Sequence, residues 1–487
     1  MFSTYRQQWF GHIRADILSG LVVGLALIPE AIAFSIIAGV DPKIGLYASF
    51  SMAVVIAIVG GRPAMISAAT GAMALLMVTL VKEHGLQYLF ATTILTGLLQ
   101  IIAGKIRLAN LMRFVSKSVV IGFVNALAIL IFMAQLPALY NVSAWVYVFV
   151  ALGLAIIYLF PYVPKIGKQI PSPLVCIIVI TALALLFNVH VPTVGDMGKL
   201  PDTLPMFLIP NIPLNLETLQ IIFPYAAAMA AVGLLESMMT ATIVDDMTHT
   251  TSNKHQECVG QGVANIVTGF MGGMAGCAMI GQSMINIKSG GRGRLSTCFA
   301  GVFLFILVVF IHDWLKVIPM AALVAVMIMV SISTFEWKSL TQFHKNPSSS
   351  NVVMIATVIV VLATHNLALG VITGVLLSSV FLANKLEKQL QCQITDTDEQ
   401  RIYQIQGQVF FSSAKKFVQL FEYQHSQNRI VIDLEQAHLW DVTSIETLDQ
   451  VIGKFKRNGM GCEIRGLNAA SVQLLQQHAT QAQLHLS

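Results

Sequence analysis

Charged residues are scarce in this chain of 487 residues: they make up 11% of it, and 56% of the residues are hydrophobic. Soluble domains average about 25% charged residues. Apolar runs long enough to cross a bilayer recur almost to residue 384. The composition therefore excludes an ordinary soluble protein and predicts a polytopic membrane protein that contacts lipid. The net charge of +5 is small and spread over loops, so no nucleic-acid partner is expected.

Metal-binding and catalytic patterns are also lacking. The cysteines form no CxxC pair, so we expect packing thiols at 176, 258, 277, 298, 392 and 462. Metal-ligand spacing is absent around three histidines, His84, His190 and His312. Residues 281–283 lack the closing glycine of a nucleophile elbow, and residues 290–294 lack the Lys-Ser/Thr ending of a phosphate loop. We therefore expect no enzyme and no cofactor other than a coupling ion.

The apolar runs predict fourteen spans or half-spans in two sets of seven. The first set lies near residues 16–38, 44–60, 70–82, 87–103, 117–136, 143–160 and 172–188. The second lies near residues 221–244, 257–271, 277–288, 295–311, 315–332, 351–364 and 367–384. A polar linker, roughly His190 to Glu217, separates them. The third member of each set is short and interrupted, which predicts an all-α membrane protein built as a seven-plus-seven inverted repeat.

The loops predict the orientation, because cytoplasmic loops are enriched in Lys and Arg. With a cytoplasmic N-terminus, the inner loops hold Arg6, Arg14, Arg62, Lys105, Arg107, Arg113, Lys117, Lys165, Lys168, Lys254, Lys288, Arg292, Arg294, Lys338, Lys345, Lys385 and Lys388. The outer loops hold Lys43, Lys82, Lys199 and Lys316. This asymmetry predicts a multi-pass protein of the inner (plasma) membrane with both termini in the cytoplasm.

Two glycine-rich, interrupted segments predict an anion site. The stretch Thr268–Arg294 predicts an extended strand that feeds a half-length helix, with unpaired N–H groups near Ala278, Met279 and Ile280. The stretch Ala64–Ala74 joins a polar, small-residue segment to a short apolar piece from Ala72. In the predicted topology the two half-helices run in opposite directions, so their positive N-terminal ends face each other near the midplane. The alternative is that the glycines only allow close helix packing.

Two carboxylates fall inside predicted spans, where an ionised side chain is costly. Glu236 lies in the middle of the eighth span with Thr240 one turn further on. The pair could hold a sodium ion, or Glu236 alone could carry a proton; the alternative is a neutral Glu bonded to backbone. Glu30, a second candidate, lies in the first span beside Pro29, which removes a helix hydrogen bond. The alternative interpretation is that Glu30 only faces a water-filled vestibule.

The composition changes after Lys385, where charged and polar residues return. Strands are predicted at 401–412, 429–434 and 462–466, an amphipathic segment at 414–425 and a helix at 445–458. Alternating strands and helices predict a small soluble α/β domain. The predicted domains are therefore residues 1–388, which span the membrane, and residues 389–487.

Several motifs together resemble the SulP (sulfate permease) family of anion transporters. They are IPEAIAFS at 28–35, DPKIGLYAS at 41–49, GGRPAMISAATGAMA at 60–74, GLLESMMTATIVDD at 233–246 and the run from VGQGVANIVTG to GGRGRLS at 259–296. The tail is similar to the STAS domain that such proteins carry on the cytoplasmic side. The resemblance implies a core domain that moves against a gate domain, a homodimer, and one anion bound between the third and tenth segments.

Carried over residue by residue, the resemblance implies an anion site made by Thr70, Gly71, Ala72, Ala278, Met279 and Ile280, with Phe34 and Glu30 lining it from the first span. Glu236 and Thr240 match the positions where sodium-coupled relatives have Asp and Thr. The family commonly has Gln at the position of Glu30. Its usual Asp-Ser-Ser/Thr-Gly loop in the STAS domain here reads Asp441-Val442-Thr443-Ser444, so Thr443 is a candidate phosphorylation site.

The expected function is secondary active import of a small oxyanion, sulfate or bicarbonate first and a dicarboxylate third, by symport with a proton or a sodium ion. A nucleobase transporter on the same fold would need a carboxylate in both the eighth and the tenth segment, and the tenth has none. A passive anion channel and a membrane sensor with an inert pore are the remaining alternatives.

Overall fold

The computed structural model describes residues 2–108, 110, 115–164, 171–200, 205–213, 215–364, 366–397, 400–424 and 429–478, without the side chains of residues 2–4 and 312. Arg113, Lys165, Lys168 and His425, which the sequence predictions use, lie outside the described residues, as does the side chain of His312. The chain separates into two compact units, Met1–Val375 and Leu376–Ser487. The predicted boundary at 388/389 falls at the end of helix α18 (Leu367–Lys388), which contributes to both units.

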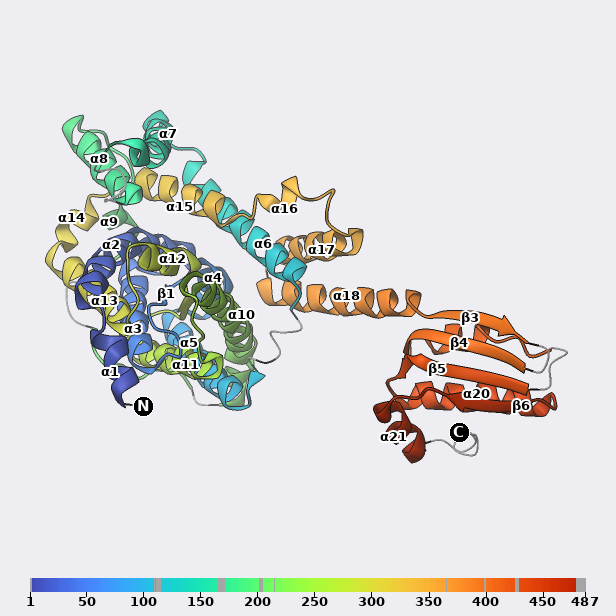
Figure 1. Ribbon diagram of the computed structural model, residues 1–487. Coiled ribbons are helices and arrows are strands. Elements are labelled where there is room, and N and C mark those ends of the chain that lie inside the picture. The colour runs from blue at the N-terminus through green and yellow to red at the C-terminus, as the bar shows by residue number, and fades with distance from the viewer. Residues whose placement is uncertain are drawn as a thin grey trace. The chain divides into compact units, whose positions relative to one another are not determined.

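One helical bundle of the first unit combines elements from both halves of the chain (Figure 1). We call it the first bundle. It consists of α2 (Ile13–Ile37), α3 (Pro42–Val59), α4 (Gly71–His84), α5 (Leu86–Lys105), α10 (Leu216–Thr248), α11 (Lys254–Phe270), α12 (Ile280–Lys288) and α13 (Arg294–Phe310). Helix α11 packs against α5 and α3, and α13 packs against α2 and α3, so the two halves are interleaved.

The second bundle again takes helices from each half. It consists of α6 (Lys117–Gln135), α7 (Ala144–Leu159), α8 (Ser172–Leu186), α15 (Met320–Thr334) and α17 (Ser348–Thr364). Besides α18, the other described helices of the first unit are short. They are α1 (Phe2–Phe10), α9 (Val194–Met197), α14 (His312–Lys316), α16 (Lys338–Thr341) and the 3-10 turns Leu136–Leu139 and Phe160–Tyr162. Helix α2 contacts α15 and α8 of the second bundle.

Each predicted apolar segment corresponds to one helix of these bundles or to α18. Among the described residues, 8 helices are long and apolar enough to cross a membrane, and Ser172–Leu186, Arg294–Phe310 and Ser348–Thr364 are shorter apolar helices. The predicted helical, membrane-spanning class is therefore confirmed. The count of fourteen crossings stays a prediction.

The two interrupted segments form short strands that pair with each other. Strand β1 (Ser67–Ala69) is antiparallel to β2 (Gly276–Ala278), with Ser67 opposite Ala278 and Ala69 opposite Gly276. A side chain at Gly276 would place its Cβ 2.3 Å from the carbonyl oxygen of Ala68, so only glycine allows this approach. The prediction of a strand feeding a half-length helix is confirmed. Its boundary was two residues early, because Ala278 belongs to β2 and α12 begins at Ile280.

The second unit contains a four-stranded sheet in the order β3-β4-β5-β6. Strand β3 (Gln391–Asp396) is antiparallel to β4 (Gln400–Val409), which is parallel to β5 (Arg429–Leu439), which is parallel to β6 (Gly461–Arg465). Helices α19 (Ala414–Gln419), α20 (Val442–Arg457) and α21 (Ala469–His478) follow the last three strands (Figure 1). Tyr403, Phe417 and Phe455 are fully buried in its core.

The predicted α/β class of this domain is confirmed, and several boundaries are corrected. The sequence analysis missed β3, whose side chains are mostly exposed and therefore show no buried periodicity. The strand predicted at 401–412 ends at Val409, the strand predicted at 429–434 runs on to Leu439, and the helix predicted from 445 begins at Val442. These boundaries depend on strand pairing and helix capping, which apolar runs alone do not fix.

Candidate anion-binding site

The β1–β2 ladder sets the start of α4 and the start of α12 against each other. Helix α4 follows the end of β1, and α12 follows the end of β2. Because the strands are antiparallel, the helices leave the ladder from opposite ends and in opposite directions. Their N-termini therefore face each other across three residue pairs, as the sequence predicts. Each N-terminus carries a partial positive charge and N–H groups without a helical acceptor.

Thr70 caps the first of these helices. Its backbone is extended, and its Oγ1 accepts a bond of 3.4 Å from the N–H of Met73. The N–H groups of Gly71 and Ala72 lie in the first turn, where a helix offers no backbone acceptor. Three of the predicted site residues, Thr70, Gly71 and Ala72, thus form one buried helix start.

The start of α12 is arranged differently from the prediction. The N–H of Ala278 donates to Oγ of Ser237 at 3.1 Å, and the N–H of Met279 donates to the carbonyl of Ile66 at 2.8 Å. The expectation of unpaired N–H groups at Ala278 and Met279 is therefore wrong, because the neighbouring chain uses both. The first-turn donors are those of Ile280, Gly281 and Gln282.

Gly281 was not among the predicted site residues, yet it lies at the open side of this helix start. It is exposed, and a Cβ built there meets no atom within 4 Å. Sequence reasoning discounted the Gly281-Gln282-Ser283 run because it lacked a catalytic pattern. The helix start lies two residues later than predicted because of the strand pairing, and this shift brings Gly281 and Gln282 into its first turn.

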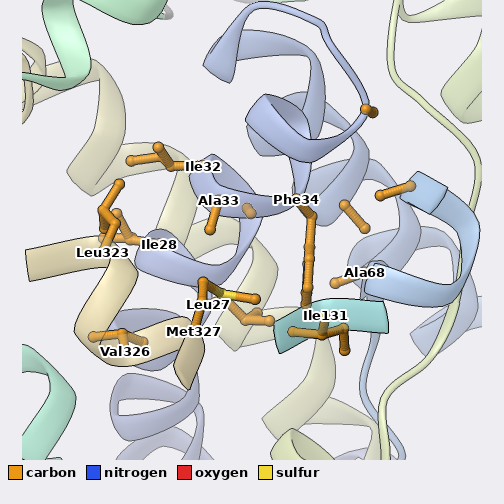
Figure 2. Close-up of a cluster of buried hydrophobic side chains, with 14 of the residues drawn as sticks. Leu27, Ile28, Ile32, Ala33, Phe34, Ala68, Ile131, Leu323, Val326 and Met327 are labelled. Carbon is orange, nitrogen blue, oxygen red and sulfur yellow. The ribbon is translucent and has the colours of Figure 1, made fainter. Parts of the chain in front are cut away.

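Phe34 covers the start of α4. Figure 2 shows its ring directed from α2 toward Ile131 of α6, with Ala68 of β1 beside it. A Cβ on Gly71 would lie 2.9 Å from Cε1 of Phe34 and 3.1 Å from Cδ1 of Ile131. Phe34 and Ile131 of the second bundle therefore both lie against the start of α4.

Glu30 lies one turn before Phe34 on α2 and is buried. Its carboxyl group lies near the side chain of Gln282, in the first turn of α12. Helix α2 continues through Pro29 to Ile37. Glu30 thus belongs to the neighbourhood of the second helix start, while Phe34 belongs to that of the first.

Glu236 and Thr240 lie on successive turns of α10, but their side chains do not bond to each other. The hydroxyl of Thr240 donates to the backbone carbonyl of Glu236 at 2.8 Å. The carboxylate instead accepts a bond of 3.0 Å from Sγ of Cys277, whose sulfur also lies 3.2 Å from Oγ1 of Thr70. The structure therefore links Glu236 to the cap of α4 through Cys277, which the sequence analysis treated as a packing thiol.

Polar contacts at one end of the first bundle tie its two halves together. Oε2 of the fully buried Glu257 accepts the N–H groups of Gly61 at 2.7 Å and Arg62 at 3.0 Å. Nε of Arg62 lies 3.2 Å from Oδ1 of Asp245 at the end of α10. The loop that precedes β1 is thus held by α10 and α11 of the other half.

Thr443, the candidate phosphorylation site, lies in the first turn of α20 and is half-buried. Asp441 caps this helix by accepting the N–H of Ser444 at 2.8 Å. The residues of the predicted loop are therefore a helix cap. Whether Thr443 is modified stays a prediction.

The fold agrees with the comparisons to known proteins. The model of the sulfate permease family matches residues 13–150 and 141–359, which cover both bundles except the end of α17. The chain belongs to the sulfate permease family. A second match, to the STAS domain, covers residues 391–486 and therefore the sheet of the second unit.

Relatives of this sulfate permease family member carry names that refer to two anions. The protein called "Putative sulfate transporter YbaR" of Bacillus subtilis (strain 168) is 56% identical over 476 residues, which cover 98% of this chain and 99% of that protein. The bicarbonate transporter BicA of a Picosynechococcus species is 26% identical over 500 residues, covering 91% of this chain and 87% of BicA.

Two solved structures show the same fold. The structure of SLC26A9 has a TM-score of 0.81 at 16% identity and covers 98% of this chain and 87% of its own. The transmembrane domain of a cyanobacterial BicA has a TM-score of 0.65 at 23% identity and covers 76% of this chain and 98% of its own. The family, the fold and the apolar helices identify a multi-pass membrane protein of an anion transporter family.

Proposed function

We propose that this protein is a secondary active transporter that moves sulfate or bicarbonate by alternating access, with a proton or a sodium ion as the coupling ion. The observation that carries the proposal is the pair of helix starts that face each other across the β1–β2 ladder. The names of the relatives support the substrate class. No catalytic chemistry is required of any residue at this site.

The helix starts suit a small oxyanion because they supply N–H donors and partial positive charge without a cationic side chain. Thr70, Gly71 and Ala72 contribute at one end, and Ile280, Gly281 and Gln282 at the other. A helix N-terminus favours an anion by about 0.3–1 kcal/mol at an exposed site and up to about 2 kcal/mol when partly buried. Two helix N-termini together give only a modest affinity, so the bound anion can leave on the other side of the membrane.

Ala278 and Met279 would contribute differently from the other site residues. Their N–H groups hold the ladder and the α10 contact in place, so they position the start of α12. Phe34 and Glu30 would line the anion from α2. Discrimination between sulfate, bicarbonate and a dicarboxylate then depends on size and hydrogen bonding near Gly281 and Phe34.

Glu236 is the proposed group for the coupling ion. It is buried in α10, and its carboxylate contacts Cys277, which contacts the cap residue Thr70. A proton or a sodium ion bound at Glu236, with Thr240 one turn on, would neutralise a charge directly behind the start of α4. Neutralising this charge would raise the affinity of the helix start for an anion. The coupling ion and the anion would therefore bind together.

Alternating access is supported by the division into two bundles. The helix starts and the proposed coupling site lie in the first bundle, whose halves are joined by Glu257 and Arg62. Ile131 of the second bundle lies beside Gly71 at the start of α4. Sliding of the first bundle, as the core, against the second, as the gate, would uncover the site on one side and then on the other.

The remaining expectations are part of the same proposal. The transporter would be a homodimer in the inner (plasma) membrane, with both termini in the cytoplasm and the STAS domain there. The residues 1–388 would then carry transport, and residues 389–487 would form the STAS domain.

Uptake into proteoliposomes tests the proposal. Labelled sulfate and bicarbonate would be offered to the purified full-length protein with inward proton and sodium gradients imposed separately. We expect one anion to accumulate under one gradient, and protein-free vesicles are the control. Uptake that reaches only equilibrium under every gradient would show a passive channel, and no uptake of sulfate, bicarbonate, fumarate, succinate or uracil would favour a sensor.

A further inference from the structure

An exposed apolar surface lies at one edge of the sheet in the second unit. It consists of Phe411, Trp440 and Val442, whose exposed fractions are 68%, 61% and 43%. We call it the aromatic edge. The N–H of Phe411 donates to Oδ2 of Asp441 at 2.8 Å, and the N–H of Trp440 donates to the carbonyl of Val409 at 3.0 Å. The three side chains therefore share the edge at which β4 and β5 end.

Residues next to the aromatic edge are hydrogen-bonded to Glu387 at the end of α18. Oγ of Ser412 donates to Oε2 of Glu387 at 3.0 Å, and Nζ of Lys416 donates to the carbonyl of Glu387 at 3.0 Å. These residues all belong to the unit Leu376–Ser487. The position of the aromatic edge relative to the end of α18 is therefore defined within one compact unit.

Helix α18 brings this edge close to lipid. The helix is apolar enough to cross a membrane, and Leu376, Val380 and Leu382 on it are exposed. From Leu382 to Glu387 the helix rises only about 8 Å, at about 1.5 Å per residue. Phe411 directly precedes Ser412, which is bonded to Glu387. If the apolar part of α18 lies in the membrane, the aromatic edge is therefore close enough to reach the lipid headgroups.

Exposed lysines occur on α18 and α19, the two helices that adjoin the segment after Phe411. Lys385 and Lys388 at the end of α18, and Lys415 at the start of α19, are exposed. Each Lys near an anionic membrane surface contributes about 1 kcal/mol of attraction. Tryptophan is enriched at membrane–water interfaces, because its ring is apolar and its N–H is polar.

We propose that the aromatic edge binds the membrane surface, with Trp440 and Phe411 in the headgroup layer at the C-terminal end of α18 and the neighbouring lysines against anionic headgroups. This contact holds the STAS domain against the bilayer. It depends on the membrane insertion of α18 and not on which anion is transported. Lipid is the occupant because the edge adjoins the end of a helix whose apolar side chains are exposed.

Quenching of Trp440 by brominated lipid tests the proposal. The full-length protein and its Trp440→Phe variant would be placed in nanodiscs made with ordinary or brominated phospholipid, and the difference between their emission spectra isolates Trp440. We expect the difference emission to be strong in ordinary lipid and to be mostly lost in brominated lipid. Equal difference emission in both lipids would overturn the proposal.

A matched control places tryptophan at the other end of the sheet. Gln424 is exposed and lies two residues after Glu422, which pairs with Arg401 at the start of β4. Gln424→Trp in the Trp440→Phe protein should stay bright in brominated lipid. If Trp440 is instead unquenched by brominated lipid but protected from aqueous acrylamide, a second copy of the chain covers the edge and the lipid proposal is wrong.

Two further variants keep Trp440 unchanged. Phe411→Ser should reduce the quenching of Trp440, because one of the two aromatic side chains of the edge is removed. Lys415→Gln should remove part of the additional quenching that phosphatidylglycerol produces over phosphatidylcholine. If Trp440 of the unaltered protein is quenched equally in phosphatidylglycerol and in phosphatidylcholine, the lysines do not contribute to the contact. That result would contradict the electrostatic part of the proposal.

Discussion

The thiol of Cys277 donates to Oε2 of Glu236 across 3.0 Å and joins the carboxylate of α10 to the strand that leads into α12. Its sulfur lies 3.2 Å from Oγ1 of Thr70, the cap of α4. One buried side chain therefore contacts both the proposed coupling group and a proposed anion-binding residue. A change at Glu236 therefore acts through Cys277 on Thr70, at the start of α4.

Replacement of Cys277 separates hydrogen bonding from packing. Cys277→Ala removes the donor to a buried carboxylate, which costs about 1–3 kcal/mol, so we expect the initial uptake rate to fall about tenfold. Cys277→Ser keeps a donor of similar size and should retain most of the rate. Initial uptake by proteoliposomes with equal protein content is the measurement. Equal rates for the two variants would remove the hydrogen bond from the mechanism.

Glu236→Gln should abolish gradient-driven accumulation, because the amide is isosteric but cannot carry a proton or the charge that holds sodium. Anion binding and folding should be largely retained, since the buried side chain keeps its shape. The comparison is Glu83→Gln, at an exposed carboxylate near the end of α4. Concentrative uptake by Glu236→Gln at the rate of the Glu83→Gln protein would exclude Glu236 from coupling.

Two glycine variants test the ladder. In Gly276→Ala the new Cβ would lie 2.3 Å from the carbonyl oxygen of Ala68, and backbone cannot move aside as a side chain can. We expect the free energy of unfolding to fall by roughly 1–3 kcal/mol, which lowers the unfolding midpoint, and uptake to be lost. In Gly281→Ala the Cβ meets no atom within 4 Å, so the unfolding midpoint should not fall. Thermal unfolding in detergent would compare them, and a stable Gly276→Ala protein would contradict the register.

Glu257→Gln should destabilise the first bundle. The carboxylate accepts two backbone N–H groups on Oε2 and the Gln261 amide on Oε1, and an amide in its place has only one acceptor atom. The loss of a buried acceptor costs about 1–3 kcal/mol. Asp246→Asn, at an exposed acid on α10, should leave the unfolding midpoint unchanged. The same midpoint for both variants would show that Glu257 does not hold the loop at Gly61 and Arg62.

Much of the fold could be predicted from residues alone. Apolar runs located every helix of the two bundles, because spanning length and low charge are local properties. The glycines around 276 and the short run after Thr70 predicted the interrupted segments for the same reason. The strand β3 and the end of the strand at Val409 were missed, since exposed strands and capping turns have no strong apolar period.

The arrangement of the two helix starts was predicted in outline, and the structure differs in detail; their role as an anion site stays a prediction. Thr70, Gly71, Ala72 and Phe34 lie together, as the family resemblance implied, and the local sequence accounts only for the helix start at Thr70. The prediction failed to see that Ser237 and Ile66 occupy the N–H groups of Ala278 and Met279, and that Gly281 and Gln282 replace them in the first turn. These partners lie far away in the sequence, so no local pattern reveals them.

The sequence by itself determined that the chain spans a membrane with helices, that two segments are interrupted, and that a soluble α/β domain follows. These properties depend on the hydrophobicity, glycine content and periodicity of short stretches. Only the tertiary structure decided that β1 pairs with β2, that Cys277 lies between Glu236 and Thr70, and that Phe411 and Trp440 follow the adjacent ends of β4 and β5. Such contacts depend on which buried polar groups find partners once distant segments pack, and that is a property of the whole fold.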